Sequence, residues 1–248
     1  MPLTAPAKPL DSPARTAPPV ARWLLLLLAF TLLWDLSGAD LSVMQRLGTA
    51  SGFALQNQWF LKQVMHGAWR QAFVGLYGLM AIWALWPSHW SLSRLTPLLL
   101  PRRERLTLLL LVALSLLAVN LLKTSSHTSC PWDLQMFGGS ARYVSHWSLW
   151  QGSDGGSGRC FPGGHASSGF AFLGLCLPWL LPPPGTHRAP AAGWWWLTAL
   201  LLAGLIAGTV QTLRGAHYPS HTLWTLLICG AVSWAGWRLA SPRLAQTG

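Results

Sequence analysis

Acidic residues are scarce in this sequence, where Asp and Glu together number six among 248 residues. All charged residues make up only 9% of the chain, whereas a soluble domain carries roughly a quarter to keep its surface hydrated. This shortage of charge excludes an ordinary soluble domain. Carboxylates that are few and scattered also provide no ligand cluster for Mg²⁺ or Ca²⁺, so we expect no metal and no cofactor.

Cysteine is also infrequent, with four residues that form neither a CxxC pair nor a zinc-ligand spacing. Cys176 and Cys229 lie in apolar runs and are expected to be inert. Cys130 and Cys160 lie in one long polar segment, where a disulfide and two free thiols fit the pattern equally well.

Hydrophobic residues, by contrast, make up 52% of the chain, which also contains 17 Trp. Indole rings favour the bilayer interface, so this composition predicts an integral membrane protein. The net charge of +11 does not indicate nucleic acid, because the basic residues are scattered between apolar runs. Membrane lipids are the expected partners, and no obligatory protein partner is inferred.

Apolar stretches recur along the chain at close to the ~20 residues that a membrane-spanning helix needs. They fall near residues 22–38, 68–87, 105–122, 167–183, 194–212 and 221–239. The sequence therefore predicts an all-α, polytopic helical bundle of about six transmembrane helices, with both termini on one side. The first stretch could instead be a signal peptide cleaved after Ala39, which would remove one crossing.

The chain divides into three parts by composition. Residues 1–20 are rich in Pro and Ala and are expected to form a flexible cytoplasmic tail, residues 21–104 hold the first two helices, and residues 105–240 hold the last four. Basic residues concentrate in the tail, in the second connection and at the C-terminus, which places these parts in the cytoplasm. We expect the inner (plasma) membrane, with the polar connection 123–166 facing the periplasm or exterior.

Three polar clusters lie at the ends of apolar stretches on this outer face. They are KTSSHTSCPWDL from Lys123 to Leu134, RCFPGGHASSGFAF from Arg159 to Phe172, and QTLRGAHYPSH from Gln211 to His221. Each alone fits a plain structural explanation: a snorkelling lysine, a glycine turn and a polar hairpin. Together they gather cations, histidines and a glycine anion cradle at one membrane face, which is the set that phosphate chemistry needs.

The order and spacing of these clusters resemble the membrane branch of the type-2 phosphatidic acid phosphatase and haloperoxidase superfamily. Its motifs are Lys-x6-Arg-Pro, Pro-Ser-Gly-His and Ser-Arg-x5-His-x3-Asp. The matching residues are Lys123, Pro131, Pro162, Gly164, His165 and His217. The departures are Cys130 and Gln211 in place of Arg, Gly163 in place of Ser, and His221 in place of Asp.

This resemblance implies a role for each matching residue. His217 would be the nucleophile that forms a phosphohistidine, and His165 the general acid for the departing alcohol. Lys123 and the amides of Gly163 and Gly164 would hold the phosphate.

Because of these departures, other residues must supply the arginine of the pocket and set the tautomer of His217. We expect Arg214, three residues after the vacant arginine position at Gln211, to reach the same pocket from the next helical turn. Without a carboxylate at position 221, the tautomer of His217 would be set by His221, by Asp133 or by a backbone carbonyl.

The expected function is metal-independent hydrolysis of a lipid phosphate or diphosphate, such as phosphatidate, phosphatidylglycerol phosphate, polyprenyl diphosphate or the lipid A phosphate. A phosphotransferase of the same fold and a non-catalytic homologue are the alternatives. A transporter is disfavoured, because the predicted spans hold almost no ionisable residue apart from Asp35. Trp59 and Phe60, in a segment without motifs, are expected to lie at the membrane interface over the site.

Overall fold

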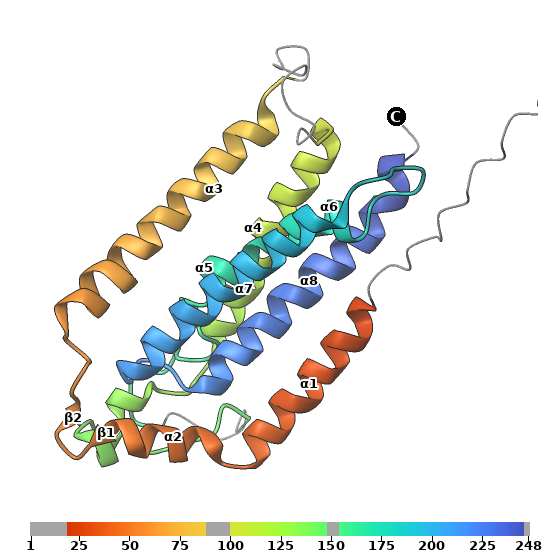
Figure 1. Cartoon of the computed structure of the whole chain (residues 1–248). Helices are drawn as coiled ribbons and strands as arrows, with labels where there is room; N and C mark the ends of the chain where they lie inside the picture. Colours follow the sequence, from red (N-terminus) through yellow and green to blue (C-terminus); the bar gives the residue numbers. More distant parts are fainter. Residues whose placement is uncertain (1–18, 88–99, 148–153, 246–248) are drawn as a thin grey trace, which may run out of the picture.

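The computed structural model describes residues 19–87, 100–147 and 154–245, so most of the predicted tail lies outside the described residues. Helices dominate the described chain (Figure 1). They are α1 (Val20–Leu36), α2 (Ala39–Leu47), η1 (Phe60–Ala68), α3 (Trp69–Leu85), α4 (Arg102–Ser125), η3 (Pro131–Asp133), η4 (Gln135–Phe137), α5 (Ser167–Phe170), η5 (Ala171–Cys176), α6 (Leu177–Leu180), α7 (Pro190–Leu213) and α8 (Pro219–Ala245). Each of the six apolar stretches contains helix, which confirms the predicted all-α membrane bundle.

The only strands in the described residues form a two-stranded hairpin of β1 (Gly48–Thr49) and β2 (Gly52–Phe53). The two strands pair antiparallel, and they follow α2 at one end of the bundle (Figure 1). The hairpin thus belongs to the segment in which the sequence shows no motif.

Three described helices, α4, α7 and α8, are long and apolar enough to cross a membrane. The pair α1 and α2 would provide a fourth span, with a bend of 65° between its two halves. At this bend Gly38 has a φ of 68°, a conformation that glycine adopts without steric cost. The two other apolar stretches form the 17-residue α3 and the shorter run Ser167–Leu180, so fewer than the six expected crossings meet the length of a full span.

The core of the bundle lies where α4 and α8 pack around η5. Leu108, Phe170, Phe172 and Trp237 are almost fully buried there. Lipid chains are as apolar as these side chains, so inside a bilayer the stabilisation comes from close packing more than from the exclusion of water.

A pair of glycines lets α5 lie directly against α7. A Cβ atom added at Gly169 would lie 2.3 Å from the backbone nitrogen of Gly204, and one added at Gly204 would lie 2.2 Å from the ring of Phe170. Small residues at such contacts allow helices to approach closely in membranes. The contact fixes the position of the chain that enters α5 through His165.

Charged side chains hold the opposite end of the bundle together. Arg188 donates two hydrogen bonds to the buried carboxylate of Glu104, with N–O distances of 2.7 and 2.8 Å. Arg105 donates to the carbonyl oxygens of Trp83 and Trp86 and so ties α4 to the end of α3. These charges lie at the end of α4 that is far from Lys123.

We expect Gly204→Ala to lower the melting temperature of the detergent-solubilised protein, because the new methyl group overlaps the ring of Phe170. Overpacking of this kind costs about 1–3 kcal/mol. Gly78→Ala in α3 is the matched control, since a Cβ there meets no atom within 4 Å, and alanine favours helix by about 1 kcal/mol. Equal melting temperatures for Gly204→Ala and wild type would contradict the close contact of α5 with α7.

Candidate active site

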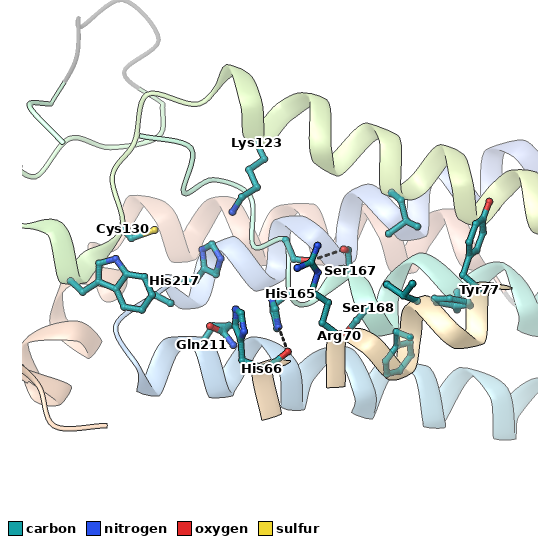
Figure 2. A pocket seen from close by; sticks show the side chains of 17 residues that line it. His66, Arg70, Tyr77, Lys123, Cys130, His165, Ser167, Ser168, Gln211 and His217 are labelled. Carbon is teal, nitrogen blue, oxygen red and sulfur yellow. Dashed lines mark hydrogen bonds between the residues drawn. The ribbon is translucent and has the colours of Figure 1, made fainter. Parts of the chain in front are cut away.

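A cavity of about 520 Å³ lies at the end of the bundle to which the three polar clusters belong (Figure 2). Its polar part is lined by His66, Arg70, Lys123, Cys130, His165, Ser167, Ser168, Gln211 and His217. Its apolar part is lined by Phe73, Val74, Leu116 and Phe172, with Tyr77 beside them. The cavity is therefore polar where the motifs meet and apolar where it runs between α3, α4 and the chain of α5 and η5.

The three sequence motifs come together on this wall. Lys123 enters from the last turn of α4, His165 precedes α5, and His217 lies in the loop between α7 and α8 (Figure 2). Gly164 lies next to Lys123, because a Cβ added at Gly164 would be 3.7 Å from Nζ of Lys123. The absence of a side chain at Gly164 leaves its backbone open to the cavity next to Nζ of Lys123.

His217 is 7% exposed and is held on its Nδ1 side. Its Nδ1 lies 3.4 Å from Sγ of Cys160 and 3.4 Å from Nδ1 of His221. Cys160 is joined to Cys130 by a disulfide bond. Burial, followed by the charge of Lys123, lowers the pKa of His217 from its usual 6.5 to about 3, so the ring is neutral at pH 7.

His165 contacts η1 through both its ring face and its ring nitrogen. Its Nε2 lies 3.1 Å from the carbonyl oxygen of His66, and the two imidazole rings stack with 3.9 Å between centroids. A carbonyl oxygen accepts only, so Nε2 of His165 carries the proton and donates it in this hydrogen bond. Burial is the main cause that lowers the pKa of His165.

Gly163 does not hold an anion in the way that the sequence predicts. Its amide donates a hydrogen bond of 3.1 Å to the carbonyl oxygen of His221, and its own carbonyl accepts one of 3.1 Å from Thr225 Oγ1. The Gly163 amide is therefore occupied, and only Gly164 of the glycine pair lines the cavity.

Arg214 also differs from its expected position, because it is not part of the cavity wall. Its guanidinium donates to the carbonyl oxygen of Gln56 and to Oε1 of Gln211, both at 3.1 Å. Gln211 lines the cavity, and its Nε2 is buried without a hydrogen-bond partner among the described residues. Arg214 thus holds the Gln211 amide in place, and the two N–H groups of this amide have no partner among the described residues.

Asp133 lies away from His217. Its carboxylate accepts a hydrogen bond of 3.1 Å from Ser157 Oγ, within the loop that joins α4 to α5. Of the three groups considered for setting the tautomer of His217, the structure places His221 and the backbone of Cys160 next to the ring, and not Asp133.

The donor atoms of Cys130, Cys160 and His217 lie within 4.8 Å of one another, a spacing that a metal ion could bridge. Metal-binding cysteines do so as thiolates. The two sulfurs are bonded to each other, so this set does not fit a metal ion while the disulfide is formed.

The family model of the PAP2 superfamily matches residues 104–244, which is more than half of the chain. The chain belongs to the PAP2 superfamily. Members of this superfamily are phosphatases and related phosphoesterases, so the protein is a hydrolase of this general class. The resemblance inferred from the motifs is confirmed, and neither a curated protein nor a solved structure matches the chain.

His66 and Arg70 line the cavity but lie outside the PAP2 match and were missed in the sequence. Trp69 Nε1 donates a hydrogen bond of 2.9 Å to Ser168 Oγ, which docks the start of α3 on α5 beside His165. A signal was present, because Lys62, His66 and Arg70 recur every four residues and would share one helical face.

The loop that carries His217 is also packed by the N-terminal segment. Gly215 has a φ of 75°, and a Cβ added there would lie 2.3 Å from the ring of Phe53. Asp40 accepts hydrogen bonds from the amide and the hydroxyl of Ser220 at the start of α8. Both ends of the loop are therefore held by residues that precede the PAP2 match.

We expect the melting temperature to fall between about pH 6.5 and pH 3 because His217 resists protonation in the folded state. Its folded pKa of about 3 lies below the unfolded value, so the unfolded chain binds the proton first as the pH falls. The free energy of unfolding then decreases by at most about 1.4 kcal/mol per pH unit. His217→Gln should lose less stability than wild type when the two are compared by thermal unfolding in detergent.

The control for this prediction is His187→Gln, at an exposed position in the loop before α7. This variant should follow the wild-type curve. Parallel curves for wild type and His217→Gln would contradict the buried, neutral ring.

Proposed function

We propose that the protein hydrolyses a lipid phosphate or lipid diphosphate in this cavity through a phosphohistidine on His217. One observation carries the proposal: the polar wall that holds Lys123, His165 and His217 continues directly into an apolar wall between helices. A phosphate group fits the first part, and the chain of a lipid fits the second.

The chemistry follows from the two histidines. The lone pair of His217 attacks phosphorus, so that an N–P bond forms while the P–O bond to the lipid breaks. His165 gives a proton to the departing oxygen, and water then attacks the phosphohistidine to release inorganic phosphate. The negative charge of a bound phosphate favours the protonated form of His165, which offsets the effect of its burial.

Phosphate binding relies on four groups in this proposal. Lys123 and Arg70 supply positive charge, while the Gln211 side chain and the Gly164 backbone supply neutral donors. The motifs have arginines at positions 130 and 211, which are Cys and Gln in this chain. Arg70 supplies a guanidinium group to the same cavity instead. Charge-assisted hydrogen bonds of this kind are about twice as strong as neutral ones.

The membrane topology that we propose has six apolar helices, with the cavity on the extracytoplasmic side. Support comes from the far end of the bundle, where Arg102, Arg103, Arg105 and Arg188 gather. Positive residues remain on the cytoplasmic side during insertion. A disulfide next to the cavity also fits an oxidising compartment.

We expect the purified protein to release phosphate from lipid phosphates in the presence of EDTA, and His217→Ala to abolish this release. Removing the nucleophile leaves no atom to form the intermediate, so a loss of about 10⁴-fold or more is expected. The measurement is inorganic phosphate released from a panel of phosphatidate, phosphatidylglycerol phosphate and polyprenyl diphosphate. His187→Ala serves as the control with wild-type activity.

Activity retained by His217→Ala would refute the phosphohistidine. If labelled phosphate leaves the substrate lipid but appears on a second lipid and not in water, the protein is a transferase.

Arg70→Gln should raise KM for the lipid phosphate by about tenfold, since a hydrogen bond to a charged group contributes about 1.5–3 kcal/mol. Arg46→Gln is the matched control, because Arg46 is exposed on α2 and does not line the cavity. Steady-state kinetics in mixed micelles measure both variants. An unchanged KM in Arg70→Gln would remove this residue from the substrate-binding site.

A further inference from the structure

The surroundings of His217 Nδ1 contain an unusual neighbour for a histidine nucleophile. Cys160 Sγ lies 3.4 Å from this nitrogen and 3.0 Å from the carbonyl oxygen of Ala216. Because the sulfur is bonded to Cys130, it has no proton, and both distances describe contacts of a disulfide sulfur. The position that carries a carboxylate in the resembling motif is taken by His221.

A nucleophilic imidazole needs its proton on one nitrogen and a lone pair on the other. His217 must carry the proton on Nδ1 if Nε2, which has no hydrogen-bond partner among the described residues, is to attack phosphorus. A neighbour that only accepts hydrogen bonds enforces this tautomer, as a carboxylate does in catalytic triads.

His221 alone cannot make this choice. Its Nδ1 lies 3.4 Å from Nδ1 of His217, and a neutral imidazole nitrogen serves as donor or as acceptor depending on its own tautomer. Its Nε2 is buried and has no partner within the described part of the chain, and the backbone carbonyl of Cys160 favours a proton on His221 as it does on His217. The contact between the two Nδ1 atoms therefore does not decide whether His217 or His221 carries the proton that lies between them.

The sulfur of Cys160 makes this choice. A disulfide sulfur has lone pairs and no proton, so it only accepts, and Cys160 Sγ lies against Nδ1 of His217. The sulfur therefore favours N–H at Nδ1 of His217, and His221 then accepts from the same N–H.

We propose that the Cys130–Cys160 disulfide is a positioning group that keeps the proton of His217 on Nδ1, in place of the missing carboxylate. The inference rests on the proposed function of His217 as nucleophile. It also makes the activity depend on the oxidation state of the pair, because reduction would turn an acceptor into a donor.

The reduction is a simple exchange. A dithiol reductant gives two electrons and two protons to the S–S bond, becomes a disulfide itself, and leaves thiols at Cys130 and Cys160. The thiol of Cys160 can then donate its S–H to Nδ1 of His217. The ring proton moves to Nε2, where it blocks the attacking lone pair.

The surrounding loop has other bonds that survive reduction. The amide of Cys160 donates to the carbonyl of Thr128 at 2.9 Å, and the amide of Arg159 donates to that of Ser126 at 2.8 Å. The carboxylate of Asp154 accepts from the amide and hydroxyl of Ser129 at 2.7 and 2.8 Å. The effect on His217 can therefore be separated from unfolding of the loop.

The test compares kcat and KM of oxidised and dithiothreitol-reduced protein, wild type and His221→Asp. We expect reduction to lower kcat of wild type by about tenfold or more while KM changes little. In His221→Asp a carboxylate again accepts from Nδ1, so reduction should lower kcat far less. Cys130→Ser, which leaves Cys160 as a thiol, should have the low kcat without reductant.

Two kinetic outcomes would overturn the proposal. The first is an equal kcat for oxidised and reduced wild type. The second is an equal loss in wild type and in an active His221→Asp variant, which would show that the bond acts only by holding the loop.

A second measurement does not depend on turnover or on the His221→Asp variant. Nitrogen-15 NMR of the imidazole rings, with His217→Gln to assign the signal, reports which nitrogen of His217 carries the proton. The proton should be on Nδ1 in oxidised protein and shift toward Nε2 on reduction, and the same tautomer in both states would overturn the inference. If no lipid phosphate is hydrolysed, the proposed function fails, while this spectrum still decides the role of the disulfide.

Discussion

The hydrogen bond from the Gly163 amide to the carbonyl of His221 is the contact on which the geometry of the site depends. It joins the chain that enters α5 to the first turn of α8, and so fixes the separation of the segments that contain His165 and His217. Thr225 adds a second link by donating to the carbonyls of both Gly163 and His221. A side chain at position 163 would press against the His221 backbone, since an added Cβ would lie 3.2 Å from its carbonyl oxygen.

The first hundred residues complete a site that the superfamily match would place in the C-terminal part alone. Phe53 packs on Gly215, Asp40 holds Ser220, and Arg70 brings a positive charge to the cavity. The PAP2 motifs supply Lys123, His165 and His217 to the cavity, and the N-terminal segment supplies packing and a second cation, Arg70. The chain thus departs from the motifs at several positions and also has contacts to the site from residues outside the motifs.

The fold class and the superfamily could be predicted because they depend on local patterns. Each apolar stretch of helical length contains helix in the described structure, and the spacing of Lys123, His165 and His217 indicated the superfamily. The direction of a single side chain depends on partners far along the chain, which spacing does not encode. Arg214 was expected in the cavity for this reason, yet it donates to the backbone of Gln56, 158 residues away.

The shortness of the α5, η5 and α6 run has a consequence for which molecules can reach His217. From Ser167 to Leu180 the run rises roughly 24 Å, less than the ~30 Å thickness of the hydrocarbon layer. The run is therefore too short to extend from one boundary of the hydrocarbon layer to the other, so at least one of its ends lies inside that layer on the proposed topology. If that end is the one next to His165, a water-soluble phosphate ester would have to leave the aqueous phase to react, whereas the chains of a lipid already hold its phosphate in the headgroup region of the membrane. The depth of the site in the membrane would then favour lipid substrates over water-soluble ones, independently of the shape of the cavity.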